Sequence, residues 1–447
     1  MVFPISEASP VKYAGPLPKE CDVVVLGGGI IGVMTAWFLA ERGFSVTLCE
    51  KGRIAGEQSS RNWGWIRQQG RDLAELPIMM ESLELWKSLS KECGPELGFR
   101  QEGVLYLART SAEMAAFEDW MTQARALGLD VGLQSSGQVR DRIKGATKQW
   151  VGGLFTASDA RAEPWVAVPM LAAGAARRRV VIVENCAVRA LDRVGGRVAG
   201  VMTELGRIAC EQVVVAGGAW SSLFLRAEGI KIPQLSVLAS VAQTQPMPDV
   251  FGGDAADDRF AFRRRADGGY TIAPGAAHDF HLGLDAFRNV GPYLPTFLKD
   301  FRKTKLRLRA PAGYPDGWGT ARKWAADQVS PFERIRVLNP APNMNTLAMV
   351  QDEFAQAMPE LGRPEIKLAW GGMIDVLPDL VPVVDRIAAV PGLVIATGMC
   401  GHGFGIGPAY GRIVADLVAG NDVGHDMTRF RFGRFSDGSR LVPGPTI

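Results

Sequence analysis

A strand, a glycine-rich turn and a helix follow one another near the start of the chain, and this unit constrains the fold more than any other feature. Residues 22–27 (DVVVLG) predict a short buried strand, and residues 30–42 predict a helix that ends at Gly43. Residues 45–50 predict a second strand. This order of elements is typical of a parallel sheet in an α/β domain.

The turn itself has the spacing of a phosphate-binding motif. Gly27, Gly29 and Gly32 form a G-x-G-x-x-G pattern directly after the first strand. Gly27 permits a tight turn, Gly29 lets the backbone approach a pyrophosphate, and Gly32 lets the helix pack closely on the strand. The start of the helix adds unpaired N–H groups and a positive dipole end. We therefore expect a dinucleotide at this turn.

Glu50 and the residues after it narrow the choice of dinucleotide. Glu50 ends the second strand 23 residues after Gly27, where its carboxylate can accept ribose hydroxyl protons and would repel a 2′-phosphate. NAD and FAD remain. Residues 51–64 are small and polar and contain glycine, which suits a loop that runs along an extended ligand. Because an NAD fold normally enters another crossover helix here, the segment favours FAD.

Two later segments predict further parts of the same site. Residues 211–218 (EQVVVAGG) predict another buried strand, which ends in a glycine pair. Residues 393–397 predict a strand that leads through a glycine-rich turn at residues 398–407 into a helix ending at Leu417. The start of such a helix can stabilise negative charge at the N1–C2=O edge of a reduced flavin.

Longer blocks of sequence carry a resemblance to a known family. They are the block from Leu17 to Arg61, which includes IAGEQSSR, and the later blocks VVVAGGAWSSLF, VSPFERIR and WGGMIDVLPDLVPVVD. The chain resembles the superfamily of D-amino-acid oxidase, glycine oxidase and sarcosine oxidase, and within it the bacterial L-amino acid deaminases most of all.

The resemblance implies oxidative deamination of an amino acid, with hydride transfer from the substrate α-carbon to flavin N5. In such an enzyme the protein mainly positions the substrate, and oxygen or a quinone accepts the electrons. One alternative is an oxidase or dehydrogenase for D-amino acids or for secondary amines such as sarcosine. A further alternative is a non-catalytic FAD-binding subunit of a larger assembly. A homo-oligomer is compatible with each.

The motifs and the resemblance together predict non-covalent FAD. In sarcosine oxidases a similar strand carries the cysteine that bonds the flavin, and Gly372 stands in that place here. The residues expected to contact the cofactor are Gly27, Gly29, Ile30, Ile31, Gly32, Glu50, Lys51, Gln58, Ser59, Ser60, Arg61, Asn62, Trp63, Gly64, Val188, Gly217, Gly218, Trp220, Gly372, Gly401, His402, Gly403, Phe404, Gly405 and Ile406.

Arg263 is the first candidate for binding the substrate. Residues 260–272 predict a hairpin around Asp267 and Gly268, and strand alternation places Arg263 and Arg265 on one face. Arg263 resembles the arginine that grips the substrate carboxylate in the deaminases, and a guanidinium can bind a carboxylate bidentately. The alternative is that these arginines form a solvated strand surface.

Four other polar residues are candidates for the active site. Arg67 and Arg71 follow the FAD loop and either grip the carboxylate or support that loop. Asp375 either faces the substrate amine or holds a backbone turn. His402 lies in the glycine-rich turn and either contacts the flavin or caps the helix.

Composition argues against several other classes of function. The chain has 50 Lys and Arg against 47 Asp and Glu, which is too even a balance to imply nucleic acid as a partner. His278 and His281 form an HxxH pattern without further ligands nearby, so we predict no metal site. Six scattered cysteines are typical of a reducing cytosol.

The predicted cofactor domain is discontinuous. An FAD-binding domain with a Rossmann-type parallel sheet (α/β) is expected to comprise residues 1–85, 156–230 and 366–447. A substrate-binding domain with a mixed sheet (α+β) is expected to comprise residues 86–155 and 231–365, with a helical insertion at about 286–330.

A basic stretch in that insertion is relevant to whether the protein associates with a membrane. Residues 299–309 include six basic residues in eleven, and the comparable insertion in the deaminases resembles a membrane-docking element. The deaminases' N-terminal anchor has no counterpart in residues 1–20. The 18 uncharged residues at 23–40 are explained by a buried strand and a helix rather than a membrane span. We expect a mainly soluble cytoplasmic enzyme, with a membrane surface as the less favoured partner.

Overall fold

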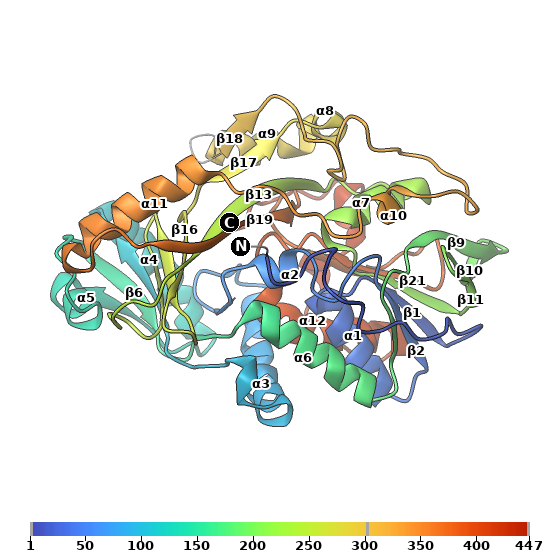
Figure 1. Cartoon of the computed structure of the whole chain (residues 1–447), viewed down its shortest axis with the longest axis horizontal. Coiled ribbons are helices and arrows are strands. Elements are labelled where there is room, and N and C mark those ends of the chain that lie inside the picture. The colour runs from blue at the N-terminus through green and yellow to red at the C-terminus, as the bar shows by residue number, and fades with distance from the viewer. Residues whose placement is uncertain (1–2, 301–303, 445–447) are drawn as a thin grey trace.

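Two sheets form the framework of the protein (Figure 1). The computed structural model of the chain describes residues 3–300 and 304–444. One sheet contains β1 (Val23–Leu26) and lies among the helices at the lower right of Figure 1, and the other contains β13 (Leu235–Thr244) and extends to the opposite side. This arrangement confirms the predicted fold class, a parallel-sheet domain combined with a mixed sheet.

The first sheet has six strands in the order β20-β21-β12-β1-β2-β8. All its neighbouring pairs are parallel except β20 with β21. Every residue of β1 and β2 is buried, as in a parallel sheet covered on both faces. The strands predicted near residues 22–27, 45–50, 211–218 and 393–397 are confirmed. The other strands are β2 (Val46–Cys49), β8 (Val181–Val183), β12 (Gln212–Val215), β20 (Val383–Arg386) and β21 (Leu393–Thr397).

Helices pack closely on this sheet and on one another. A Cβ atom at Gly411 would lie 2.4 Å from the Cβ of Met34, so glycine lets α12 approach α1. A Cβ atom at Gly32 would lie 1.9 Å from the carbonyl oxygen of Gly27, so the start of α1 tolerates only glycine there. The helices of this layer are α1 (Ile30–Glu41), α3 (Leu76–Cys93), α6 (Pro164–Arg177) and α12 (Gly403–Ala419).

The second sheet is mixed and has the order β18-β17-β13-β16-β15-β14-β4-β6-β5, with β19 (Ile366–Val376) paired to β13. The hairpin predicted around Asp267 and Gly268 is confirmed as β15 and β16. Residues 366–376, which the sequence assigns to the cofactor domain, pair along β13 and so connect the two regions. The remaining strands are β4 (Val104–Ala108), β5 (Val131–Ser135), β6 (Gly152–Thr156), β14 (Asp254–Ala256), β15 (Ala261–Arg264), β16 (Tyr270–Ala273), β17 (His278–His281) and β18 (Thr304–Arg307).

Smaller elements complete the described chain. Two short sheets consist of β9 (Val188–Val194), β10 (Arg197–Thr203) and β11 (Gly206–Ala209), and of β3 (Trp65–Ile66) with β7 (Ala160–Arg161). The remaining α-helices are α2 (Gln58–Arg61), α4 (Ser111–Ala126), α5 (Ser136–Arg142), α7 (Ser221–Ala227), α8 (Leu284–Arg288), α9 (Val290–Asp300), α10 (Pro331–Arg334) and α11 (Met344–Ala357).

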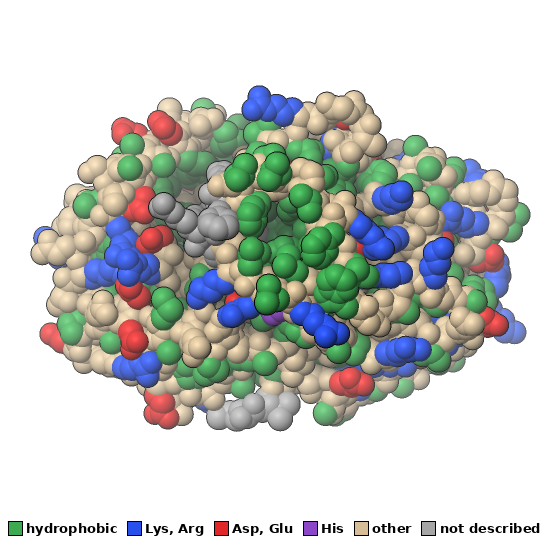
Figure 2. All heavy atoms as spheres, turned by 90° about the horizontal axis from the view of Figure 1, so that it is seen from above, with side chains coloured by type: hydrophobic (Ala, Val, Ile, Leu, Met, Phe, Trp, Pro, Cys, Tyr) green, Lys and Arg blue, Asp and Glu red, His purple; other side chains and the backbone are tan. Residues whose placement is uncertain are grey.

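The insertion is helical only at its start. α8 and α9 are followed by β18, and the residues from 308 to 330 form turns and irregular structure. Figure 2 shows hydrophobic side chains gathered on the face that carries these elements. Part of the basic stretch, residues 301–303, lies outside the described residues. Among the described helices, none has both the length and the apolar character required to cross a bilayer. Among the described residues of the insertion, the exposed large apolar side chains are Phe287, Val290, Leu294, Leu298, Leu306, Leu308, Trp318 and Val329.

Candidate functional site

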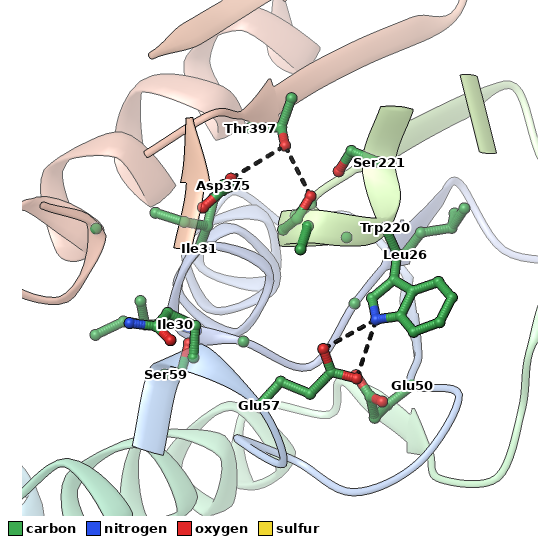
Figure 3. A pocket seen from close by; sticks show the side chains of 18 of the residues that line it. Leu26, Ile30, Ile31, Glu50, Glu57, Ser59, Trp220, Ser221, Asp375 and Thr397 are labelled. Carbon is green, nitrogen blue, oxygen red and sulfur yellow. Dashed lines mark hydrogen bonds between the residues drawn. The ribbon is translucent and has the colours of Figure 1, made fainter. Parts of the chain in front are cut away.

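A cavity of about 170 Å³ lies where the parallel strands of the first sheet end (Figure 3). Its wall comes from the glycine-rich turn before α1, the loop after β2, the end of β12 and the turn before α12. Sixteen residues that the sequence predicts at the cofactor line it: Gly27, Gly29, Ile30, Ile31, Glu50, Lys51, Gln58, Ser59, Asn62, Val188, Gly217, Gly218, Trp220, Gly401, Gly403 and Phe404.

Glu50 is held at one end of this cavity by backbone groups. Its two carboxylate oxygens accept hydrogen bonds from the N–H of Gly28 and of Gly52, each at 2.7 Å. Burial raises the pKa of Glu50 to about 6, although Lys51 and these two N–H groups act in the opposite direction. Each oxygen keeps a further lone pair for a donor such as a ribose hydroxyl.

Glu57 links three parts of the cavity wall, and sequence reasoning gave it no role. Its carboxylate accepts hydrogen bonds from Lys51 Nζ at 2.5 Å and from Trp220 Nε1 at 2.9 and 3.1 Å. The N–H of Leu338 donates to it at 3.1 Å. Figure 3 shows Glu57 and Trp220 pointing toward each other at the edge of the cavity. The one feature of the sequence that could have marked Glu57 as a site residue was its position inside the IAGEQSSR block.

Asp375 holds a backbone turn, which is one of the two roles considered for it. One of its carboxylate oxygens accepts hydrogen bonds from the N–H of Gly398 at 2.7 Å and of Met399 at 3.2 Å. Thr397 Oγ1 lies 3.4 Å from the same oxygen, as Figure 3 shows. These contacts fix the turn between β21 and α12, so that the start of α12 faces the cavity.

Several other residues of the wall were not predicted. Thr397 and Met399 border predicted glycines, and Met373 lies between Gly372 and Asp375. Phe332 belongs to the VSPFERIR block, which carried resemblance but no assigned role. The side chains approach the cavity from segments that only the folded chain brings together.

A second cavity of about 80 Å³ adjoins the first, and it has a different chemical character. The two share Gln58, Asn62, Gly401 and Phe404 in their walls. Arg67, Arg71 and His402 line the second cavity together with the predicted cofactor residues Arg61, Trp63 and Gly405. Its remaining lining residues are Trp65, Ala239, Val241, His278 and Ile374.

Arg67 and Arg71 bring positive charge to this second cavity. Arg67 Nη1 donates to the carbonyl of Gln69 at 2.5 Å. Arg71 donates to the carbonyl of Arg67 at 3.0 Å and to that of His402 at 3.1 Å, and its Nη1 has no hydrogen-bond partner. Within the described residues neither guanidinium lies within 4.0 Å of a carboxylate oxygen, so Arg67 and the Nη1 group of Arg71 remain available to an anionic ligand.

Arg263 lies elsewhere, and its position argues against the predicted role. It is 1% exposed and lines neither cavity among the described residues. Its Nη1 and Nη2 donate to the two oxygens of Glu163 at 2.9 and 3.0 Å, and Arg265 lies 3.5 Å from the same carboxylate. Because a bidentate partner already occupies this guanidinium, it is not placed to grip a substrate, and it is not a solvated surface residue either.

Five predicted cofactor residues line neither cavity: Gly32, Ser60, Gly64, Gly372 and Ile406. They support the wall from behind. A Cβ atom at Gly372 would lie 2.4 Å from Gln58 Oε1, and one at Gly64 would lie 2.5 Å from the carbonyl of Ala162. A side chain at position 372 of strand β19 would therefore require Gln58 to shift.

Residues 22–417 match the family described as FAD dependent oxidoreductase. The chain belongs to the FAD dependent oxidoreductase family. It is similar to the sarcosine oxidase subunit beta of Rhizobium meliloti (strain 1021), with 26% identity over 95% of this chain and 90% of the relative. This family membership confirms the predicted cofactor class and the prediction of an oxidoreductase.

Solved structures of family members have the same fold. The L-amino acid deaminase from Proteus myxofaciens in complex with anthranilate superimposes with a TM-score of 0.91 and 29% identity, covering 97% of each chain. The L-amino acid deaminase from Proteus vulgaris gives a TM-score of 0.89 and 29% identity, covering 94% of this chain and 98% of that one.

The residues of the larger cavity fit FAD. Glu50 offers acceptors at one end, and the start of α12 offers a positive dipole end at the other. Gln58 Oε1 and Ser221 Oγ line the cavity between them and have no hydrogen-bond partner within the described chain, which a ligand with donors and acceptors would supply. This FAD-dependent oxidoreductase therefore has a cofactor cavity and, beside it, a smaller basic and aromatic cavity.

Proposed function

We propose that this protein oxidises an amino acid, whose carboxylate binds at Arg67 and Arg71 in the second cavity. The observation that carries the proposal is a pair of arginines that form no ion pair within the described part of the chain and that line a small cavity adjoining the cofactor cavity. A guanidinium suits a carboxylate because its planar fork forms two parallel hydrogen bonds. When bound, the flavin supplies the two-electron acceptor for the hydride that leaves the substrate α-carbon.

The remaining wall of the second cavity supports a substrate with an apolar body. Trp63, Trp65, Val241 and Ile374 surround the space beside the arginines. Burial against these side chains excludes water from the carboxylate contacts and strengthens them. A polyamine, which would need carboxylates in this position, is disfavoured by the same lining.

A secondary amine with a carboxylate, such as an N-methyl amino acid, is the second candidate. The relative in Rhizobium meliloti carries the name sarcosine oxidase subunit beta, and sarcosine would use the same carboxylate site. Neither arginine distinguishes a primary from a secondary amine, because both would act on the carboxylate end.

Anaerobic reduction of the flavin tests the proposal. Purified FAD-loaded protein is mixed without oxygen with L-amino acids, D-amino acids and N-methyl amino acids, and the flavin absorbance is followed. We expect bleaching by members of one class, and hydrogen peroxide on admission of air if oxygen is the acceptor. If no compound in the three classes bleaches the flavin, the protein is not an amino acid oxidoreductase, and a non-catalytic FAD-binding subunit becomes the better account.

The flavin is expected to be bound without a covalent link. Gly372 supports this prediction, because glycine has no side-chain atom that could bond the flavin. Acid precipitation should release the yellow colour into the supernatant, where its absorbance is measured. Colour that stays with the precipitated protein would contradict it.

A further inference from the structure

His402 borders the second cavity at the start of α12. It is 5% exposed, and neither of its ring nitrogens has a hydrogen-bond partner among the described residues. Buried polar atoms in native proteins are nearly always hydrogen-bonded, so a buried imidazole nitrogen left without a partner on a cavity wall points to a ligand. Its backbone is fixed, because Arg71 donates to its carbonyl at 3.1 Å.

Glu75 lies behind this ring, directly before α3. Its side chain is fully buried, and its Oε2 lies 3.8 Å from Nδ1 of His402 and accepts no hydrogen bond from the residues that the structure describes. The other oxygen is 3.3 Å from the hydroxyl of Tyr410, which donates to it. A carboxylate beside Nδ1 favours the tautomer that carries a hydrogen on Nδ1, and this tautomer leaves Nε2 as an acceptor.

We propose that His402 accepts a hydrogen bond from the substrate amino group, and that Glu75 is the positioning residue that fixes its tautomer. The proposal rests on the proposed function and deepens it. The carboxylate of an amino acid would bind at Arg67 and its amine at His402, on the wall that the two cavities share through Gly401 and Phe404. The substrate α-carbon would thereby lie between two fixed contacts.

The charges around the ring suit a neutral acceptor. The pKa of His402 is lowered to about 4, chiefly by burial. Arg71 and Arg67 also lower this pKa, and the contact with Glu75 acts in the opposite direction. Arg71, His402 and Tyr410 hold the pKa of Glu75 below its usual value in spite of its burial. The imidazole is therefore neutral near pH 7. The two arginines disfavour an ammonium group in the same cavity, so the site selects the neutral amine whose lone pair the oxidation requires.

Two ligands that differ by one amino group test this proposal. Anthranilate carries an aromatic amine that is neutral near pH 7, and benzoate has the same carboxylate and ring without the amine. Their dissociation constants are measured from the change in flavin absorbance of the FAD-loaded protein. The quantity compared between variants is the ratio of the benzoate constant to the anthranilate constant.

We expect His402→Phe to lower this ratio about twofold to twelvefold, which is the usual range for the loss of one hydrogen bond, and to leave benzoate binding unchanged. His402→Gln, whose amide oxygen can still accept, should retain part of the ratio. Glu75→Gln should lower it by a smaller factor, because the charge that fixes the tautomer is removed. His425→Phe is the matched control, because His425 pairs with Glu81 at 2.6 Å and lines neither cavity.

A ratio that stays at the wild-type value in both His402 variants would overturn the proposal. Equal losses of benzoate and anthranilate affinity in both variants give this same unchanged ratio, and they would show that His402 is a merely structural residue. If His402→Phe does not retain FAD, the ratio in His402→Gln and Glu75→Gln decides. The proposed carboxylate site fails separately, when Arg67→Ala leaves benzoate binding unchanged.

Discussion

Two segments of the chain bring arginines toward the centre of the molecule, and they use them in opposite ways. On β15, Arg263 is fully buried and forms a bidentate ion pair with Glu163. In the segment after β3, Arg67 donates to the carbonyl of Gln69, forms no ion pair with a carboxylate of the described residues, and lines the second cavity. The first guanidinium has its charge neutralised by the protein, whereas the second keeps its charge available for a ligand.

This difference shows why residue type alone does not identify a binding arginine. Removing either charge from water costs several kcal/mol, and the cost must be offset by a partner. Arg263 finds that partner 100 residues away in sequence, at the residue before α6. Arg67 has no such carboxylate partner within the described chain, so a carboxylate ligand is the natural one.

The largest expected effect is on stability, at Arg263. Arg263→Ala leaves the buried Glu163 with the N–H of Ala266 at 2.9 Å and with Arg265 at 3.5 Å in place of its bidentate partner. Breaking a buried ion pair from one side costs about 3 to 5 kcal/mol. Urea unfolding of the FAD-loaded protein measures this loss. Arg67→Ala is the control, and it should unfold within about 0.5 kcal/mol of the wild type. If Arg263→Ala is as stable as the wild type but has lost affinity for carboxylates, then Arg263 and not Arg67 is the binding arginine.

The next effect concerns acid stability and the same ion pair. Burial by itself raises the pKa of Glu163, but Arg263 and Arg265 outweigh burial and lower it to about 2 from its usual 4.5. Because the folded-state pKa is the lower one, the stabilisation is present above pH 4.5 and is lost as pH falls toward 2. Its full size is about 3 kcal/mol.

Glu163→Gln should therefore differ from the wild type most near neutral pH and least near pH 3. Unfolding midpoints of both proteins from pH 7 to pH 3 measure the difference. A gap that stays constant over this range would show that the charge of Glu163 contributes nothing to stability.

A smaller free-energy change is expected for ligand binding at Arg67. Arg67→Ala removes a charge-assisted contact and should weaken benzoate binding by about 1.5 to 3 kcal/mol, roughly 10- to 150-fold in Kd. Arg67→Lys should recover only part of this, because an ammonium cannot form the bidentate contact. Titration of flavin absorbance measures both. If Arg263→Ala retains FAD, we expect it to bind benzoate with the same Kd as the wild type, because Arg263 lines neither cavity.

The smallest effect is expected at the surface of the insertion, where arginine charge is again partly neutralised. Arg307 pairs with Asp279 at 2.7 Å, while apolar side chains such as Leu298 and Leu308 are exposed nearby in sequence. We expect the protein to stay mostly in the supernatant after sedimentation with anionic liposomes, with a weak bound fraction that high salt removes. Strong binding that persists in high salt would contradict the prediction of a mainly soluble enzyme.

The parallel-sheet half of the fold could be predicted because its signals are local. The valine-rich runs of β1 and β12, the glycine turn and the strand ending before Glu50 each act within a few residues, and all occur where the sequence places them. The mixed sheet was harder to predict from the sequence. Its strand β19 belongs to it only through pairing with β13, which lies more than 100 residues away in the sequence. The insertion predicted to be helical at about 286–330 is helical only in α8 and α9, and turns and irregular structure stand at residues 308–330.

The residues of the candidate site likewise fall into those that a local motif predicts and those whose role depends on distant contacts. Residues that belong to a spaced motif, such as Gly29 and Glu50, line the cofactor cavity. The environments of Arg263 and His402 depend on Glu163 and Glu75, which no local pattern connects to them. Sequence could therefore propose arginines as a group, and only the folded contacts distinguish a paired arginine from an available one.

The most direct test of the account compares an amino acid with the amine that remains when its carboxylate is removed. Flavin reduction is measured anaerobically in a stopped-flow instrument, in the wild type and in Arg67→Ala, with the best amino acid from the screen and its decarboxylated amine. If Arg67 binds the substrate carboxylate, the amino acid reduces the flavin fast only in the wild type, and the amine reduces it equally slowly in both proteins. Reduction of the wild type by the amine as fast as by the amino acid, or an unchanged rate and substrate dependence in Arg67→Ala, would contradict it.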